Sequence, residues 1–207
     1  TGEFFGDEFR GGQSWNGYEN NVLMRNEGIN ENGEIEFTDV GMAMGVDDMS
    51  DAKGFVAADF DHDGDLDIVI NNNPGDVTRY TELGIEPITP TYLRNEVGNV
   101  RNWIAVELVG GARPGETKGW SNRDAVGAQV TIETSDGLKQ LRHVSIGSNY
   151  ASQQAARLFF GLGEQESVKT LSVSWPSGRS QEFNNIAVGQ IVEISEKSDS
   201  VTEFLEP

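Results

Sequence analysis

Residues 55–72 read FVAADFDHDGDLDIVINN, and the centre of this stretch predicts both a metal site and the strands around it. Five aspartates occupy alternate positions: Asp59, Asp61, Asp63, Asp65 and Asp67. Their carboxylates repel one another unless a cation lies among them. Because Ca²⁺ takes oxygen ligands in a large and flexible coordination shell, this spacing predicts a calcium site.

The role of each ligand follows from the spacing D-x-D-x-D-G-x-x-D, counted from the first aspartate. Side chains are expected to ligate at the first, third, fifth and ninth positions, which are Asp59, Asp61, Asp63 and Asp67. Asp65, at the seventh position, is expected to turn its backbone carbonyl inward. Gly64 permits the sharp turn between these ligands.

The flanks distinguish this loop from an EF-hand, which has helices on both sides and a bidentate Glu at the twelfth position. The twelfth position here is Ile70. The neighbouring segments 54–60 and 66–71 are too short for such helices, and they are rich in strand-forming residues. The loop is therefore predicted to join two β-strands. The alternative is a solvated acidic turn, but such a turn does not need five aspartates in register.

Composition limits the class of protein. The chain has 207 residues, enough for one or two domains, and no cysteine, which excludes disulfides and thiolate zinc sites. Its net charge of -19 opposes binding to nucleic acid and favours cations and basic partners, although adaptation for solubility or salt explains such a charge equally well. No apolar run is long enough to span a bilayer, so membrane insertion is not expected.

The first third of the chain has a repeated rhythm of short strands and turns. Strands are expected at 18–26, 35–40, 55–60 and 66–71. The segment TYLRNE at 91–96 then echoes VLMRNE at 22–27. Such a repeat is typical of propeller blades, so residues 1–95 predict a partial β-propeller with a calcium-binding loop. One blade cannot bury both its faces alone, so it is expected to pack on the following domain, on a partner or on further blades.

The remainder of the chain predicts a second β-domain. Residues 74–90 contain three prolines and indicate a long connection with room for one helical turn. Further strands are expected at 103–109, 125–134, 138–146, 157–162, 168–175, 181–186 and 191–195. This density of strands predicts a β-sandwich or barrel over 96–197, followed by a loose acidic tail at 198–207. The predicted fold class is therefore all-β.

These residues resemble a known pairing of modules. The stretch AADFDHDGDLDIVINN is similar to the calcium-binding core of an FG-GAP/VCBS repeat, the blade unit of integrin-type propellers. The segment 94–196 resembles the ASPIC/UnbV domain that follows such repeats in the cartilage acidic protein-like family and its bacterial relatives. Four motifs carry this second resemblance, in the order RNWIAVELVG, SNRDAVGAQVTI, SIGSNYASQQAARLFFGLG and VSWPSG.

The resemblance implies a calcium-binding protein with an adhesive or matrix role, located outside the cell, at the cell surface or in the periplasm. Proteins of this family carry several FG-GAP repeats and a signal peptide. This sequence has one clear calcium loop, and no apolar signal-peptide core follows Thr1. It is therefore expected to be a processed form, a part of a longer protein or a short member of the family.

Weaker acidic and polar patterns occur elsewhere. Residues 30–36 loosely repeat the calcium pattern, but a hairpin turn is favoured over a second metal site. An acidic stretch before the main loop, with Asp47, Asp48 and Asp51, is expected to be a solvated loop rather than an outer ligand. The polar segments 121–124 and 148–154 are compatible with a polar ligand or a carbohydrate, and a structural role as hydrogen-bonded loops is favoured for both.

Catalysis is not expected, because no G-x-S-x-G, H-E-x-x-H or P-loop pattern appears and His62 and His143 have no nucleophile beside them in the sequence. Trp103, Trp120 and Trp175 are expected to be core or interface anchors rather than a sugar platform. The prediction is a non-enzymatic, calcium-binding interaction or assembly protein with a protein partner or self-assembly. The alternative is a ligand- or glycan-binding accessory module of a larger secreted protein.

Overall fold

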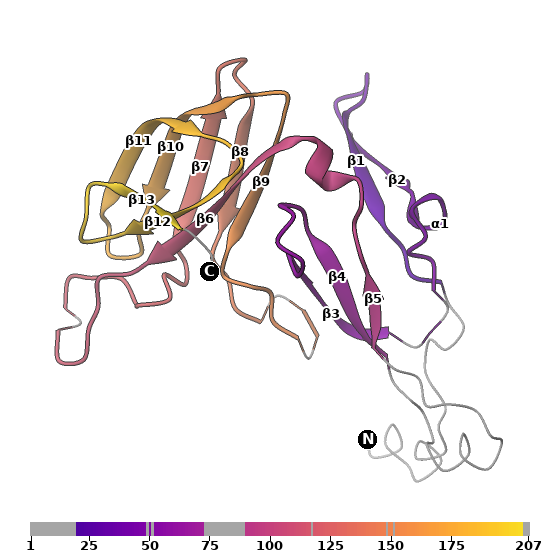
Figure 1. The fold of residues 1–207 in the computed structure, drawn as a ribbon, viewed down its shortest axis with the longest axis horizontal. Coiled ribbons are helices and arrows are strands. Elements are labelled where there is room, and N and C mark those ends of the chain that lie inside the picture. Colours follow the sequence, from indigo (N-terminus) through magenta and orange to yellow (C-terminus); the bar gives the residue numbers. More distant parts are fainter. Residues whose placement is uncertain are drawn as a thin grey trace, which may run out of the picture. The chain divides into compact units, whose positions relative to one another are not determined.

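The computed structural model describes residues 20–48, 50, 52–72, 90–116, 118–147, 149–150 and 152–204. The elements of the first part are β1 (Met24–Ile29), β2 (Ile35–Asp39), α1 (Gly41–Met44), β3 (Ala52–Ala58), β4 (Asp67–Asn72) and β5 (Thr91–Leu93) (Figure 1). A 3₁₀ helix (Gly98–Val100) precedes the strands of the second part. These are β6 (Asn102–Val109), β7 (Gln129–Thr134), β8 (Lys139–His143), β9 (Leu158–Gly163), β10 (Ser167–Ser174), β11 (Ser180–Ala187), β12 (Gln190–Ser195) and β13 (Val201–Phe204).

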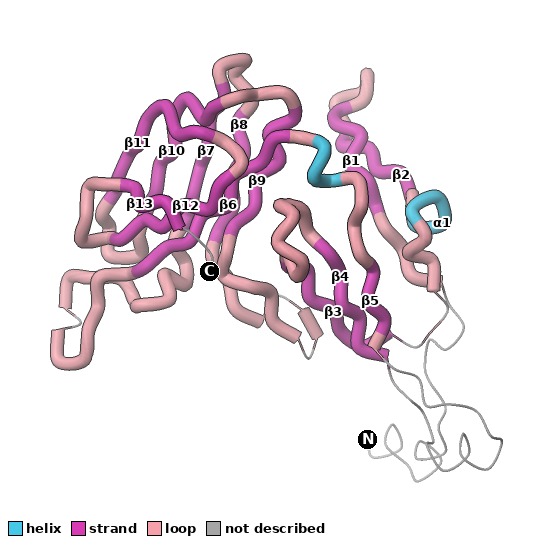
Figure 2. Tube along the Cα trace, in the orientation of Figure 1, coloured by secondary structure: helices cyan, strands magenta, loops and turns pink. Residues whose placement is uncertain are grey.

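Strands dominate the described residues, and helix is confined to two short segments (Figure 2). The predicted all-β class is confirmed. Two strands begin several residues later than expected: the strand expected at 18–26 begins at Met24, and the strand expected at 125–134 begins at Gln129. The second begins late because residues 122–128 form a turn before β7: Asn122 Oδ1 accepts the Val126 N–H at 2.9 Å, and Ala125 takes a left-handed φ of 52°. The connection predicted over 74–90 lies outside the described residues except at residue 90.

Two four-stranded sheets in the second part of the chain share one hydrophobic core. Their strand orders are β11-β10-β7-β8 and β13-β12-β6-β9. Neighbouring strands are antiparallel except β12 and β6, which run parallel. Inward side chains of both sheets fill the core, and the largest of them are fully buried: Ile104, Ile132, Phe160, Leu171 and Ile194. This arrangement is a β-sandwich.

The predicted alternative of a barrel is not what the structure shows, since neither of these sheets closes through its described strands. A side chain instead joins the edge strands β8 and β9. Gln140 Nε2 donates to the carbonyl oxygen of Gly161 at 2.6 Å. The sandwich therefore stays open along this side, where this hydrogen bond and the Arg142 guanidinium, 5.5 Å from the centroid of the Phe160 ring, connect β8 with β9.

The expectation of a loose tail over 198–207 is wrong for residues 201–204, which form β13. This strand pairs antiparallel with β12, from Ile194↔Val201 to Ile191↔Phe204. Val201 also packs against the sandwich core. Edge pairing of this kind satisfies backbone groups of β12 that would otherwise face water, and it does not depend on the acidic composition of the segment.

The chain divides into two compact units, 1–55 with 69–93 and 56–68 with 94–207. In the first unit, β1 and β2 form a two-stranded antiparallel sheet. A further three-stranded sheet has the order β3-β4-β5. The described residues do not form a four-stranded blade, so a propeller remains a proposal, and the domain limits predicted at 1–95 and 96–197 remain predictions. No helix in the described part of the chain has the length and apolar character needed to cross a membrane.

A buried carboxylate fastens three segments of the sandwich together. Glu196 follows β12 and is 2% exposed. Its Oε2 accepts the backbone N–H groups of Gly111 and Ser121 at 2.7 and 2.8 Å, and its Oε1 accepts the hydroxyls of Ser121 and Ser177. Burial by itself raises the pKa of Glu196, but these hydrogen bonds, led by that of Ser177, outweigh burial and hold the pKa below its ordinary value.

Glu196 is expected to make the sandwich sensitive to acid. A carboxyl group whose pKa is lowered by folding stabilises the fold above its unfolded pKa, and that stabilisation is lost as the pH falls through the folded value. Glu196→Gln should therefore reduce the fall in the free energy of unfolding between about pH 6 and about pH 3, measured by urea denaturation. Glu196→Ala should lower the free energy of unfolding by about 3 kcal/mol at neutral pH, because it leaves buried N–H groups without an acceptor.

Glu182 on β11 provides the matched control for this experiment, because its side chain is exposed. Glu182→Gln should leave the pH profile as it is in the unmodified protein. A Glu196→Gln profile that overlays that of Glu182→Gln would contradict the role given to Glu196.

Candidate metal centre

The acidic loop lies between β3 and β4, so the predicted strand–loop–strand arrangement is confirmed. β3 ends at Ala58 and β4 begins at Asp67, which places the run of aspartates almost entirely in the loop. Two backbone positions show how tightly the chain turns here. His62 takes a left-handed φ of 61°, and Gly64 takes a φ of 95°.

Three of the five predicted ligands come together. Asp59, Asp61 and Asp63 each offer a carboxylate oxygen, and these oxygens lie within 4.8 Å of one another. Among the described residues this is the one such group of metal-ligating side chains. The turn holds two of the carboxylates in place: Asp59 accepts the N–H groups of Asp63 and Gly64 at 3.2 and 3.1 Å, and Asp63 accepts that of Asp65 at 3.2 Å.

The electrostatics of Asp59 favour a cation at this point. Burial raises the pKa of Asp59, and the negative charge of Asp63 adds to that effect. Backbone N–H groups of Gly64, Asp63 and His62 act in the opposite direction, but the net change is upward. A cation among the three carboxylates would stabilise their charged forms and remove this penalty.

The other two predicted ligands lie elsewhere in the loop. Asp67 is fully buried, and its two oxygens accept the N–H groups of Phe60 at 3.3 Å and Asn95 at 2.8 Å. It therefore ties the base of the loop to the segment after β5, and further lone pairs on its oxygens could still serve a metal. The Asp65 side chain packs against Gly98, where an added Cβ would lie 2.6 Å from the Asp65 Cβ. Ligation by the Asp65 carbonyl and the Asp67 side chain stays a prediction.

A tryptophan from β6 supports the turn. A Cβ added to Gly64 would lie 2.1 Å from Trp103 Nε1, so the loop backbone rests directly on the indole. Two features of this position favour glycine: the left-handed φ and the close contact of the backbone with Trp103. Trp103 also packs against Phe159 on β9, with 5.9 Å between the two ring centroids.

Two more contacts fix the loop from outside. Arg94 Nε lies 2.8 Å from Asp61 Oδ2 and 2.9 Å from Glu96 Oε1, so one positive charge already approaches the acidic cluster. The backbone N–H of Ala57, at the end of β3, donates to Gln154 Oε1 at 2.7 Å. Sequence reasoning gave neither Arg94 nor Gln154 a role at this loop, because both partners lie far along the chain. The segment 148–154 was expected to be a hydrogen-bonded loop, and Gln154 makes such a bond to β3.

The weaker candidates are structural where the structure describes them. Asn30 Oδ1 accepts the N–H groups of Asn32 and Glu34, both at 3.0 Å, so the segment 30–36 forms a hairpin turn whose Asn30 side chain is already used. Asp48 binds Ser50 and Thr91. Asp51 lies outside the described residues.

The tryptophans follow the expectation of anchors. The Trp120 ring lies 4.1 Å from the Arg179 guanidinium carbon and 4.9 Å from Lys197 Nζ, measured to the ring centroid. Gly111 also packs against the Trp120 ring, so this indole is not a free platform. Trp175 is buried in the core and donates from Nε1 to Gln181 at 2.7 Å.

Comparison with known proteins agrees with the C-terminal resemblance. Residues 118–201 match the family described as "ASPIC and UnbV". Over 154 residues, 74% of this chain, the sequence is 30% identical to "Cartilage acidic protein 1" of Homo sapiens, of which it covers 19%. The Mus musculus protein of that name gives the same identity over 154 residues, with 20% of its length covered. The chain therefore spans about one fifth of these curated relatives, and residues 118–201 carry an ASPIC/UnbV domain.

Proposed function

We propose that this chain is a calcium-binding interaction module in which one Ca²⁺ ion fixes the acidic loop against the β-sandwich. The observation that carries the proposal is the convergence of the Asp59, Asp61 and Asp63 carboxylates within 4.8 Å on a turn that rests on Trp103. Oxygen-only ligands suit Ca²⁺. In this proposal Asp67 adds a side-chain ligand, Asp65 adds its carbonyl, and the ion is structural rather than catalytic.

The strand–loop–strand arrangement supports a related proposal for the first part of the chain. β3, the acidic loop, β4 and β5 would form part of an FG-GAP/VCBS-type blade, with β1 and β2 belonging to a neighbouring blade. Calcium sites of extracellular modules have dissociation constants of about 0.1–1 mM, so such sites fill only in calcium-rich surroundings. We therefore place the protein outside the cell, at the cell surface or in the periplasm.

The interaction role rests on an exposed apolar face of the β1–β2 sheet. Its register places Met24 opposite Asp39, Asn26 opposite Phe37 and Ile29 opposite Ile35. The four large apolar side chains of this face are all exposed: Met24, Ile29, Ile35 and Phe37. A contiguous face of exposed, large apolar side chains often marks a site of protein interaction. We therefore propose a protein partner or a second copy of the chain for it.

Calcium is expected to raise the melting temperature, and EDTA to lower it. At a free concentration about 100-fold above the dissociation constant, one bound ion adds about 2.7 kcal/mol to the free energy of unfolding. Asp61→Ala should lose this response, because it removes one of the three converging carboxylates. Asp199→Ala removes an exposed carboxylate outside the loop and should keep it. Differential scanning calorimetry measures both, and melting curves that EDTA does not shift would overturn the proposal.

Gly64→Ala tests the contact with Trp103 without removing any carboxylate. The added Cβ would overlap the indole, and the alanine backbone would have to adopt a left-handed φ. We therefore expect the free energy of unfolding in EDTA to fall by about 3 kcal/mol and the stabilisation by calcium to become weaker. Gly137→Ala is the matched control, because Gly137 has a φ of 88° with no atom within 4 Å of the added Cβ. The free energy of unfolding of Gly137→Ala should fall by only about 1 kcal/mol, the cost of placing a residue with a Cβ in the left-handed conformation. Equal urea midpoints for the two variants would rule out the Trp103 contact.

Self-association is the form of the interaction role that can be measured without a partner. In calcium, sedimentation velocity should show a species heavier than the monomer. Phe37→Ser, on the apolar face, should shift it toward the monomer, whereas Thr38→Ser, on the opposite face, should not. A monomer at every concentration, with calcium present, would contradict self-assembly. The alternative role, a ligand- or glycan-binding module, is favoured only by a groove in the sandwich unit.

A further inference from the structure

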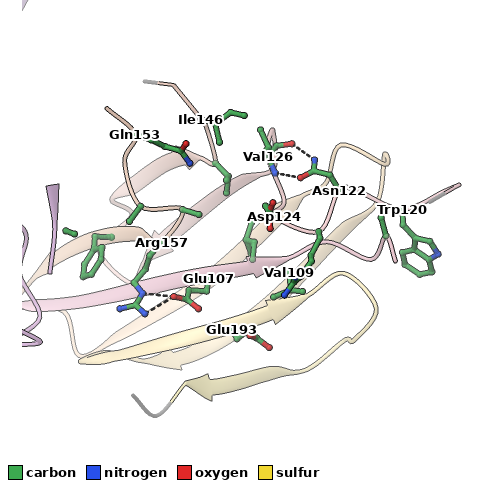
Figure 3. A pocket seen from close by; sticks show the side chains of 18 of the residues that line it. Glu107, Val109, Trp120, Asn122, Asp124, Val126, Ile146, Gln153, Arg157 and Glu193 are labelled. Atoms are coloured by element: carbon green, nitrogen blue, oxygen red, sulfur yellow. Dashed lines mark hydrogen bonds and ion pairs between the residues drawn. The ribbon is translucent and has the colours of Figure 1, made fainter. Parts of the chain in front are cut away.

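The sandwich unit carries a groove that the metal loop does not explain (Figure 3). Its volume is about 1300 Å³, and its lining comes from β6, β12, the segment between β6 and β7 and the segment that leads into β9. One end reaches Asp59, at the start of the acidic loop. Pockets for drug-sized ligands occupy about 300–1,000 Å³, so this groove has room for a larger ligand.

One carboxylate in the groove has no partner of opposite charge. Arg157 binds Glu107 through two nitrogens, Nε at 2.8 Å and Nη2 at 2.7 Å, and these two residues neutralise each other. Arg113 donates from Nη1 to the carbonyl oxygens of Gly110 and Ala112. On β12, the half-buried Glu193 carboxylate has no hydrogen bond or ion pair within the described ranges. Such a carboxylate gains from a basic group that a ligand brings.

The rim of the groove carries one charge of each sign. Arg123 and Asp124 are adjacent, both are exposed, and they form no ion pair with each other among the described residues. Asp124, Val109 and Glu107 are among the side chains that line the groove (Figure 3). Arg113 adds a further positive charge and Asp59 belongs to the proposed calcium site, so Glu193 is the half-buried carboxylate that the described residues of the groove leave without a partner.

Apolar side chains and the state of Trp120 decide the ligand class. Val109, Val126 and Ile146 line the groove, and Ile146 is 61% exposed. Sugar rings bind most readily on an open aromatic face, whereas Trp120, which also lines the groove, is half-buried with Arg179 and Lys197 against its ring. Apolar side chains beside an unpaired carboxylate instead suit a peptide.

We infer that this groove binds an extended segment of a partner protein in which apolar side chains alternate with basic ones. The apolar side chains lie against Val109, Val126 and Ile146, and a lysine or arginine pairs with Glu193. Alternation follows from extended backbone, whose successive side chains point to opposite sides. The inference deepens the interaction role proposed above, but it does not depend on the cation.

The probe is a fluorescein-labelled, acetylated decapeptide of alternating valine and lysine, and its partner peptide has glutamate in place of lysine. Fluorescence anisotropy at about 150 mM salt, where long-range attraction is screened, should show binding of the lysine peptide only. Glu193→Gln should weaken that binding about tenfold, through the lost charge pair. Ile146→Asn should weaken it by about tenfold as well, through lost apolar contact, and its exposed position should leave the fold intact.

Glu182→Gln is the control, since it removes an equal charge from β11, whose residues do not line the groove. It should change the affinity by less than about twofold. Equal losses in Glu182→Gln and Glu193→Gln would show non-specific attraction to an acidic protein and overturn the inference, as would competition by a neutral oligosaccharide or occupation of the groove by a second copy of the chain. Peptide binding is expected both with calcium and in EDTA, so failure of this test and failure of the calcium test are separate results.

Discussion

The contact between Gly64 and Trp103 is the constraint on which the metal loop depends. A side chain at residue 64 would overlap the indole, so glycine is the residue that lets this turn lie against Trp103 without strain. Asp67 reaches Asn95, and Gln154 reaches Ala57, so the loop is held at its tip, its base and its entry. Every one of these partners belongs to the sandwich unit. The acidic loop and the sandwich are therefore one physical object, and an ion bound to the loop would stabilise both.

Two surfaces of the chain, one in each compact unit, are candidates for binding. The β1–β2 sheet presents an apolar face, and the sandwich unit presents a groove with an unpaired half-buried carboxylate on β12. They differ in kind, because the first favours another apolar surface and the second favours a basic, extended segment. Trp120 lines this groove, but it is half-buried and Arg179 and Lys197 lie against its ring, so it does not offer an open face for stacking on sugars. A role in protein interaction therefore has more physical support than a role in carbohydrate binding.

Local pattern was enough to predict the acidic loop, its flanking strands and most strands of the sandwich. Alternating aspartates and alternating apolar residues can be recognised within a short segment of sequence. They predict the strands correctly because successive side chains of a strand point to opposite faces, of which one is buried. The supports of the loop could not be predicted in this way. Trp103 and Gln154 meet the loop only after the chain has folded, and nothing in their own neighbourhoods marks them as its partners. The same holds for Glu196, whose four hydrogen bonds join segments on both sides of the core. β13 was missed because its four residues, VTEF, are too short a run to predict a strand by themselves, and β12 supplies the pairing that orders them.

Terbium luminescence tests the central claim most directly. Tb³⁺ takes oxygen ligands as Ca²⁺ does, and it emits when a nearby excited tryptophan transfers energy to it. If the acidic loop binds the ion on top of Trp103, excitation of tryptophan should produce terbium emission that Ca²⁺ competes away and that Trp103→Phe abolishes, while Trp175→Phe leaves it unchanged. Absence of sensitised emission, or emission that persists undiminished in Trp103→Phe, would contradict the account.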